Sequence, residues 1–101
     1  MYRGTTPTVT FNLSADFELS MIDKCYVTFK SRSGKHEITL EDVVINEEES
    51  TLSVTLSQED TLSFDEGLVE IQIRIKLSSG EAYASPVKSF TMKQILKDGI
   101  I

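Results

Sequence analysis

The chain is 101 residues long, and its 40% hydrophobic and 26% charged residues are typical of one globular domain rather than of a disordered tail. Its formal net charge is −6 and its ten Lys and Arg residues are scattered along the sequence, so we expect no nucleic-acid partner, because phosphate binding needs a basic stripe. Cys25 is the single cysteine, which excludes an internal disulfide and leaves the fold to its apolar core.

The N-terminal stretch MYRGTTPTVTF has no apolar segment of the length of a signal peptide. No run in the chain approaches the ~20 apolar residues that a membrane span needs. We therefore expect a protein that is made in the cytoplasm and has no contact with a membrane.

Alternation of apolar and polar residues with a period of two predicts five short strands before residue 57. Each strand would turn one face to the core and the other to solvent. In chain order, the expected inward residues are Val9, Phe11 and Leu13; Cys25, Val27 and Phe29; Ile38 and Leu40; Val43 and Ile45; and Leu52, Val54 and Leu56. Val44 is the alternative to Val43 and Ile45, since it has the opposite phase.

The segment SADFELSMID, residues 14–23, lies between the first two strands. Its apolar residues Phe17, Leu19, Met21 and Ile22 are in mixed phase, which fits neither a strand nor a regular helix. We expect a compact loop or a helical turn that lies over one end of the core.

Polar turns separate the strands. SRSGK at 31–35 and SSGE at 78–81 lead through serines into Gly34 and Gly80, and glycine adopts positive φ freely, which suits a tight hairpin. NEEES at 46–50 predicts a polar loop.

LSQEDTLSF, residues 56–64, predicts one helical turn. Ser57 can cap its first N–H groups, and Glu59 and Asp60 lie near its positive end. This turn leads into LVEIQIRIKL, residues 68–77, which we expect to be a central strand paired on both sides. Its expected inward residues are Val69, Ile71, Ile73, Ile75 and Leu77.

About seven short strands, turn signals every 8–12 residues and no long helix predict an all-β fold. The expected architecture is an immunoglobulin-like antiparallel β-sandwich with one short helical turn. The Cys…Trp…Cys pattern of antibody domains is absent, because the chain has one cysteine and no tryptophan. The prediction therefore concerns the architecture only.

The sequence offers no residues that we expect to catalyse a reaction or to bind a cofactor or a metal. A hydrolase triad needs a histidine beside an activated nucleophile, and the chain has one histidine, His36, which we expect on the surface of the 31–35 hairpin. Cys25 is expected to be a small buried hydrophobe. The acidic pairs and triplet at 41–42, 47–49, 59–60 and 65–66 lack the spacing of a calcium loop and are interpreted as solvated turns.

The segment 95–101 contains four large apolar residues, Ile95, Leu96, Ile100 and Ile101. Chain ends fray unless they are tied down, so these residues need something to pack against. Either they pack back on the domain formed by residues 1–94, or they form an arm that docks on a neighbouring subunit. These four residues are the candidate interface.

Several stretches together resemble a group of small proteins encoded in prophages of Gram-positive bacteria, especially Firmicutes. The resemblance covers nearly the whole chain, and its most recognisable parts are RGTTPT, LSQEDTL and LKDG. The expected fold also resembles the immunoglobulin-like N-terminal domain of siphophage upper baseplate proteins, which attaches to the tail. The 101 residues depart from that pattern because they include no stalk or helical bundle after the domain, and the family has no catalytic motif to carry over.

The resemblance implies a non-enzymatic phage structural protein, a tail or baseplate component incorporated in the virion. Its partners would be other phage structural proteins or further copies of itself, joined through edge strands and termini. The alternative is a soluble prophage protein that regulates or inhibits a host process through its acidic loops. A glycan-binding module ranks below both, because it would have only Tyr2, Tyr26 and Tyr83 for stacking on sugars.

Overall fold

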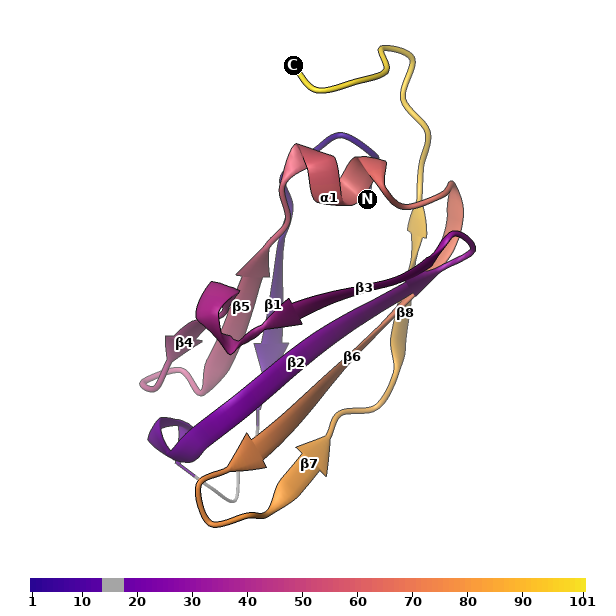
Figure 1. The fold of residues 1–101 in the computed structure, drawn as a ribbon. Helices are drawn as coiled ribbons and strands as arrows, with labels where there is room; N and C mark the ends of the chain where they lie inside the picture. The colour runs from indigo at the N-terminus through magenta and orange to yellow at the C-terminus, as the bar shows by residue number, and fades with distance from the viewer. Residues whose placement is uncertain (14–17) are drawn as a thin grey trace.

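The structure, a computed structural model, describes residues 1–13 and 18–101. Its described residues form two antiparallel sheets (Figure 1). The three-stranded sheet has the order β1 (Thr8–Asn12), β5 (Thr51–Thr55), β4 (Val44–Asn46). The larger sheet has the order β3 (Gly34–Thr39), β2 (Ile22–Ser31), β6 (Gly67–Leu77), β7 (Ala82–Ala84), and β8 (Lys88–Met92) also pairs with β6. The predicted all-β sandwich is confirmed.

Helical structure is confined to short turns in the described part of the chain. The 3-10 turn η1 (Leu19–Met21) falls in the segment expected to be a loop or helical turn, and its Leu19 is buried. Residues 14–17 of that segment, including Phe17, lie outside the described residues. A second 3-10 turn, η2 (Leu40–Asp42), joins β3 to β4, and α1 (Gln58–Leu62) is the predicted helical turn before β6.

The core lies between the two sheets. All five expected inward residues of β6 are buried, with exposures of 5% or less, and so are the expected residues of β2. Opposite them lie Leu52, Val54 and Leu56, which are also fully buried. Val9 and Leu13 pack against this core while partly exposed. The period-2 prediction therefore holds for most of the strands.

The inward phase continues into β4, although burial is incomplete there. Ile45 lies opposite the buried Leu52 and so is on the core side of its sheet, as expected, but it is 36% exposed. Val44, the alternative, lies opposite Ser53 and is 68% exposed. The exposure arises because the chain leaves β3 through the η2 turn and reaches the other sheet as a three-residue edge strand. Leu40 and Val43 flank this crossing and pack against the core.

β6 is the central strand, as predicted. It pairs with β2 on one side, and on the other side with β8 near its beginning and β7 near its end. Ser85 and Pro86 separate β7 from β8, and proline has no N–H to give to the ladder. The Ser85 hydroxyl accepts a hydrogen bond from Ile73 N at 3.1 Å, so the backbone of β6 stays satisfied across the interruption.

Candidate interface at the α1 end

Three segments that are far apart in the sequence meet at one end of the molecule. They are residues 1–7, 57–64 and 93–101, and we call their assembly the α1 end; it lies at the top of Figure 1 with both chain ends. The stretches RGTTPT, LSQEDTL and LKDG all lie in or next to it.

The helix at the centre of this end begins with a capping box. Ser57 Oγ accepts from Asp60 N at 3.0 Å, and Asp60 Oδ2 accepts from Ser57 N at 2.9 Å. Two N–H groups of the first turn are thus satisfied by two side chains three residues apart. This explains why a helix of only five residues forms at this crossover.

Arg3 completes the other end of the helix. Its Nε donates to Phe64 O at 3.0 Å, and one terminal nitrogen donates to Leu62 O at 2.9 Å. The other terminal nitrogen donates to Gln94 Oε1 at 2.6 Å. The guanidinium therefore places a positive charge at the helix C-terminus, where it is favourable, and joins the helix to the last segment of the chain.

Close packing holds the N-terminal loop against the same helix. The buried hydroxyl of Thr61 donates to Thr5 O at 2.9 Å. Gly4 has φ +73°, and a Cβ there would lie 3.0 Å from Ile95 Cδ1 and 3.5 Å from Leu62 Cδ2. Glycine is needed at position 4 both for its backbone conformation and for this approach.

The last segment is anchored at several points, and three of its four large apolar side chains are left exposed. Lys93 N donates to Met1 O at 2.7 Å, and Ile95 is partly buried against Gly4. The Gln58 amide holds the backbone of Ile101, accepting from its N at 2.8 Å and donating to its O at 3.1 Å. The most exposed large apolar residues of the segment are Leu96 at 107%, Ile101 at 87% and Ile100 at 65%.

The four candidate interface residues are therefore not equivalent. Ile95 packs within its own molecule, whereas Leu96, Ile100 and Ile101 are exposed. In Figure 1 the last segment of the chain runs above α1. Docking of these three side chains on a neighbour remains a prediction.

His36 and Cys25 have structural surroundings. His36 lies on the inward side of β3 with Ile38 and is partly buried rather than fully at the surface. Its Nε2 is 3.1 Å from Asp60 Oδ1, and its ring meets Phe64 edge-on at 5.9 Å. In the described chain, no serine or cysteine is hydrogen-bonded to His36. Burial raises the pKa of the Cys25 thiol to about 11, which disfavours the thiolate that a nucleophile needs.

Metal-ligating residues do not converge either. Among residues 1–13 and 18–101, no group of three His, Cys, Asp or Glu side chains is placed to hold a metal ion. The same residues contain no helix that is long and apolar enough to span a bilayer.

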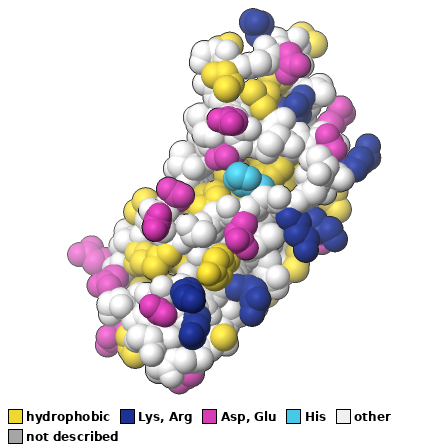
Figure 2. All heavy atoms as spheres, in the orientation of Figure 1, with side chains coloured by type: hydrophobic (Ala, Val, Ile, Leu, Met, Phe, Trp, Pro, Cys, Tyr) yellow, Lys and Arg dark blue, Asp and Glu magenta, His cyan; other side chains and the backbone are white. Residues whose placement is uncertain are grey.

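The sequence-based interpretation missed the arrangement of charge. The basic residues are scattered in the sequence, yet Lys and Arg side chains gather over the front sheet in Figure 2, while Asp and Glu side chains line the left margin. The sequence does indicate this separation of charge, because residues 36–73 contain eleven Asp and Glu residues and no Lys or Arg. All ten basic residues and the other five acidic residues lie outside that stretch.

Comparison of the chain with protein-family models, with curated proteins and with solved structures gives no match.

Proposed function

We propose that this protein is a non-enzymatic structural component of a phage or prophage particle, in its tail or baseplate, and that it assembles through the α1 end. The observation that carries the proposal is the exposure of Leu96, Ile100 and Ile101 on a segment whose backbone is fixed to the domain. A frayed end would not need the contacts made by Gln58 and Arg3. The family resemblance, which falls on the same end of the molecule, agrees with this role.

The energetics favour an interface of modest intrinsic affinity. Burying a large apolar side chain contributes ~1.5–3 kcal/mol gross, so the three exposed residues together can contribute several kcal/mol. Ordering a flexible segment offsets part of that gain. Because Gln58 already holds the backbone of Ile101, docking requires a smaller loss of conformational entropy.

Repetition would convert this modest affinity into stable assembly. Subunits in a ring engage their neighbours together, and each further contact then forms at high effective concentration. The partner is either another phage structural protein or a second copy of this chain. Both choices need the α1 end to be exposed.

The test is incorporation into particles. Tagged protein is expressed in the host during induction of the phage, and the particles are separated on a density gradient. We expect the wild-type chain to cosediment with particles and the double variant Leu96→Gln with Ile100→Gln to remain in the soluble fraction. The matched control, Leu68→Gln with Met21→Gln, changes two residues that are 62% and 39% exposed elsewhere, and it should cosediment normally. Wild-type protein that is absent from particles would refute the proposal.

The regulatory or inhibitory alternative is favoured by one observation, the exposed acidic triplet Glu47, Glu48 and Glu49 in the β4–β5 connection. Gene neighbourhood separates the two functions. Tail genes on both sides support the structural role, whereas early or lysogeny genes support the regulatory one.

A further inference from the structure

The outer face of the five-stranded sheet, which is the face turned away from the core, carries half of the basic residues of the chain. The alternation that buries Cys25, Val27 and Ile75 turns their neighbours on β2, β3 and β6 outward. The basic residues of this outer face are Lys24, Lys30, Lys35, Arg74 and Lys76. Tyr26, which is 37% exposed, lies opposite Arg74 among them.

None of these basic side chains forms an ion pair within 4.0 Å in the described part of the chain, where the one such pair joins His36 to Asp60, on the inward side of β3. Two acidic residues share the outer face with them, Glu37 on β3 and Glu70 on β6. On the outer face, Lys24 lies directly opposite Lys76, and Lys30 lies opposite Lys35 as well as Glu70. Like charges in directly opposed positions destabilise a sheet. The face therefore carries an unfavourable arrangement that an acidic partner would relieve.

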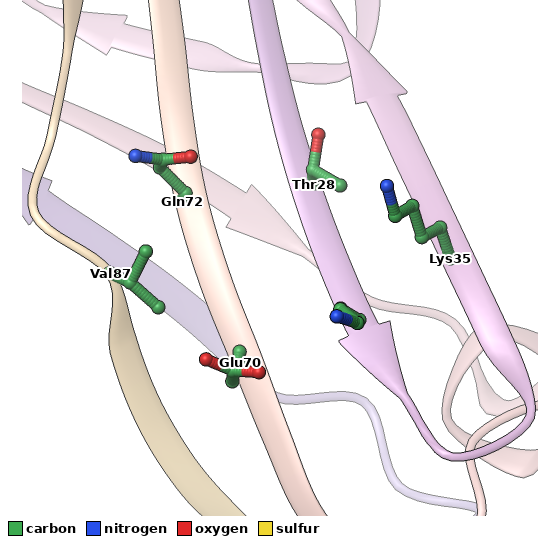
Figure 3. A pocket seen from close by; sticks show the side chains of 6 residues that line it. Thr28, Lys35, Glu70, Gln72 and Val87 are labelled. Carbon is green, nitrogen blue, oxygen red and sulfur yellow. The ribbon is translucent and has the colours of Figure 1, made fainter.

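The hollow in this face has mixed polarity. It is lined by Thr28, Lys30, Lys35, Glu70, Gln72 and Val87. Figure 3 shows the labelled side chains that line this hollow, with Lys35 on one side and Glu70 and Val87 on the other. A partner that fits it must offer carboxylates together with some apolar surface. A phosphate backbone fits poorly, because Glu70 lies in the hollow and the whole chain has a net charge of −6.

The chain itself presents such a surface at the edge of the other sheet. We call it the acidic edge: the exposed residues Glu41, Asp42, Val44, Ile45, Glu47, Glu48 and Glu49. In the described part of the chain, its strand β4 pairs only with β5, so the other side of β4 is an open edge. The acidic edge thus carries five carboxylates and two exposed apolar side chains, and its Glu41 lines a hollow together with Lys24 of the outer face.

We propose that the basic outer face of one molecule binds the acidic edge of a second copy. β4 belongs to the three-stranded sheet, which packs on the inner side of the five-stranded sheet, so the contact forms between molecules. The two surfaces differ, so the contact is head-to-tail. A row of subunits joined in this way has a free outer face at one end and a free acidic edge at the other. These two free surfaces either bind each other and close a ring, or bind further subunits and extend a filament. Its biological meaning rests on the proposed assembly role, but it uses different residues from the α1 end.

The first test is self-association in sedimentation velocity at low and high salt. We expect wild-type protein to associate at concentrations up to about 1 mM in low salt, and we expect this charge-dependent part of its association to weaken as salt screens exposed charges. Reversing the face (Arg74→Glu with Lys76→Glu) or the edge (Glu47→Lys with Glu48→Lys) should raise the dissociation constant at least roughly tenfold, because like charges then oppose each other. The control Arg32→Glu with Lys88→Glu changes the net charge by as much as the face variant, at residues that belong neither to the basic set of the outer face nor to the α1 end, and should associate like wild type.

The decisive experiment mixes the variant with the reversed face and the variant with the reversed edge. Each variant alone keeps only one of the two surfaces unmodified and should lose the salt-dependent association, whereas an equimolar mixture should recover it, because the unmodified face of one variant meets the unmodified edge of the other. A mixture that does not recover this association overturns the proposal, as does wild-type protein whose association does not depend on salt.

The same sedimentation measurements at low and high salt, repeated with the Leu96→Gln and Ile100→Gln substitutions present, distinguish this contact from the contact at the α1 end. Salt-dependent association that persists there belongs to the charged surfaces. Association that disappears in that background overturns the charge contact and leaves the assembly role of the α1 end standing.

Discussion

Burial decides what a side chain contributes along β6. Ile73 is 1% exposed and lies among the buried residues of β2 and β5, while its neighbour Arg74 extends from the opposite side of the same strand into solvent. Substitutions at adjacent residues of this strand should therefore change the free energy of unfolding by very different amounts.

We expect Ile73→Asp to unfold the domain and Arg74→Ala to leave its stability nearly unchanged. The first places an unpaired charge in the core, at a cost of several kcal/mol against a total stability of ~5–15 kcal/mol. The second alters one solvated side chain, usually worth within ~0.5 kcal/mol. Urea titrations followed by circular dichroism measure both. Equal losses of stability would mean that β6 is buried on two faces.

Cys25 should make stability depend on pH at the alkaline end. Burial raises the pKa of its thiol from 9.0 to about 11, so the folded protein keeps this proton where the unfolded chain has lost it. The free energy of unfolding should then fall as pH rises from about 9 to about 11. Urea titrations at pH 8 and about 10.5 compare wild type with Cys25→Ala, which removes only this contribution. The same pH dependence in both proteins would show that the thiol does not contribute.

At the scale of elements, local sequence rules account for most of the fold. The strands at 8–12, 51–55 and 67–77 follow the period-2 pattern, and the cap at Ser57 is visible in the sequence because its hydrogen bonds are local. The pattern predicted the phase of Ile45 but not its 36% exposure, which depends on tertiary structure, because the η2 turn leads the chain into an edge strand of the other sheet. The partial burial of His36 was also missed, because it depends on Asp60 and Phe64, which are remote in the sequence.

The capping box of α1 gives a prediction at this scale. Ser57→Ala removes the acceptor for Asp60 N and should cost ~0.5–2 kcal/mol of stability. Ser57→Asp keeps an oxygen in the same place and should recover most of that loss. Thermal melts of the three proteins at equal concentration are the measurement. A Ser57→Ala protein with unchanged stability would mean that packing around Thr61 holds the helix without its cap.

The whole molecule, which measures 47 × 23 × 19 Å, has two features that no local pattern contains. One is the meeting of residues 1–7, 57–64 and 93–101 at the α1 end, where Arg3 contacts groups about 60 and 91 residues away. The other is the separation of charge between the outer face and the acidic edge. Both arise from how the sheets bring distant segments together. The apolar character of 95–101 was clear from the sequence, but the different surroundings of Ile95 and Leu96 were not.

Removing residues 96–101 separates assembly from folding at this scale. The truncation deletes Lys97 and Asp98 together, so the formal net charge from side chains is unchanged. Ile95, which packs against Gly4, is retained. We therefore expect a folded protein with a cooperative thermal transition, since the deleted side chains are exposed. Loss of that transition in dilute solution would show that the segment closes the core of its own domain.

The most direct test of the account is sedimentation velocity of this truncated chain beside the full chain, at about 0.5 M salt, where contacts between exposed charges are screened. The account predicts that the full chain forms concentration-dependent oligomers through Leu96, Ile100 and Ile101, and that the truncated chain sediments as a folded monomer. A folded truncated chain with the same association state as the full chain would contradict it.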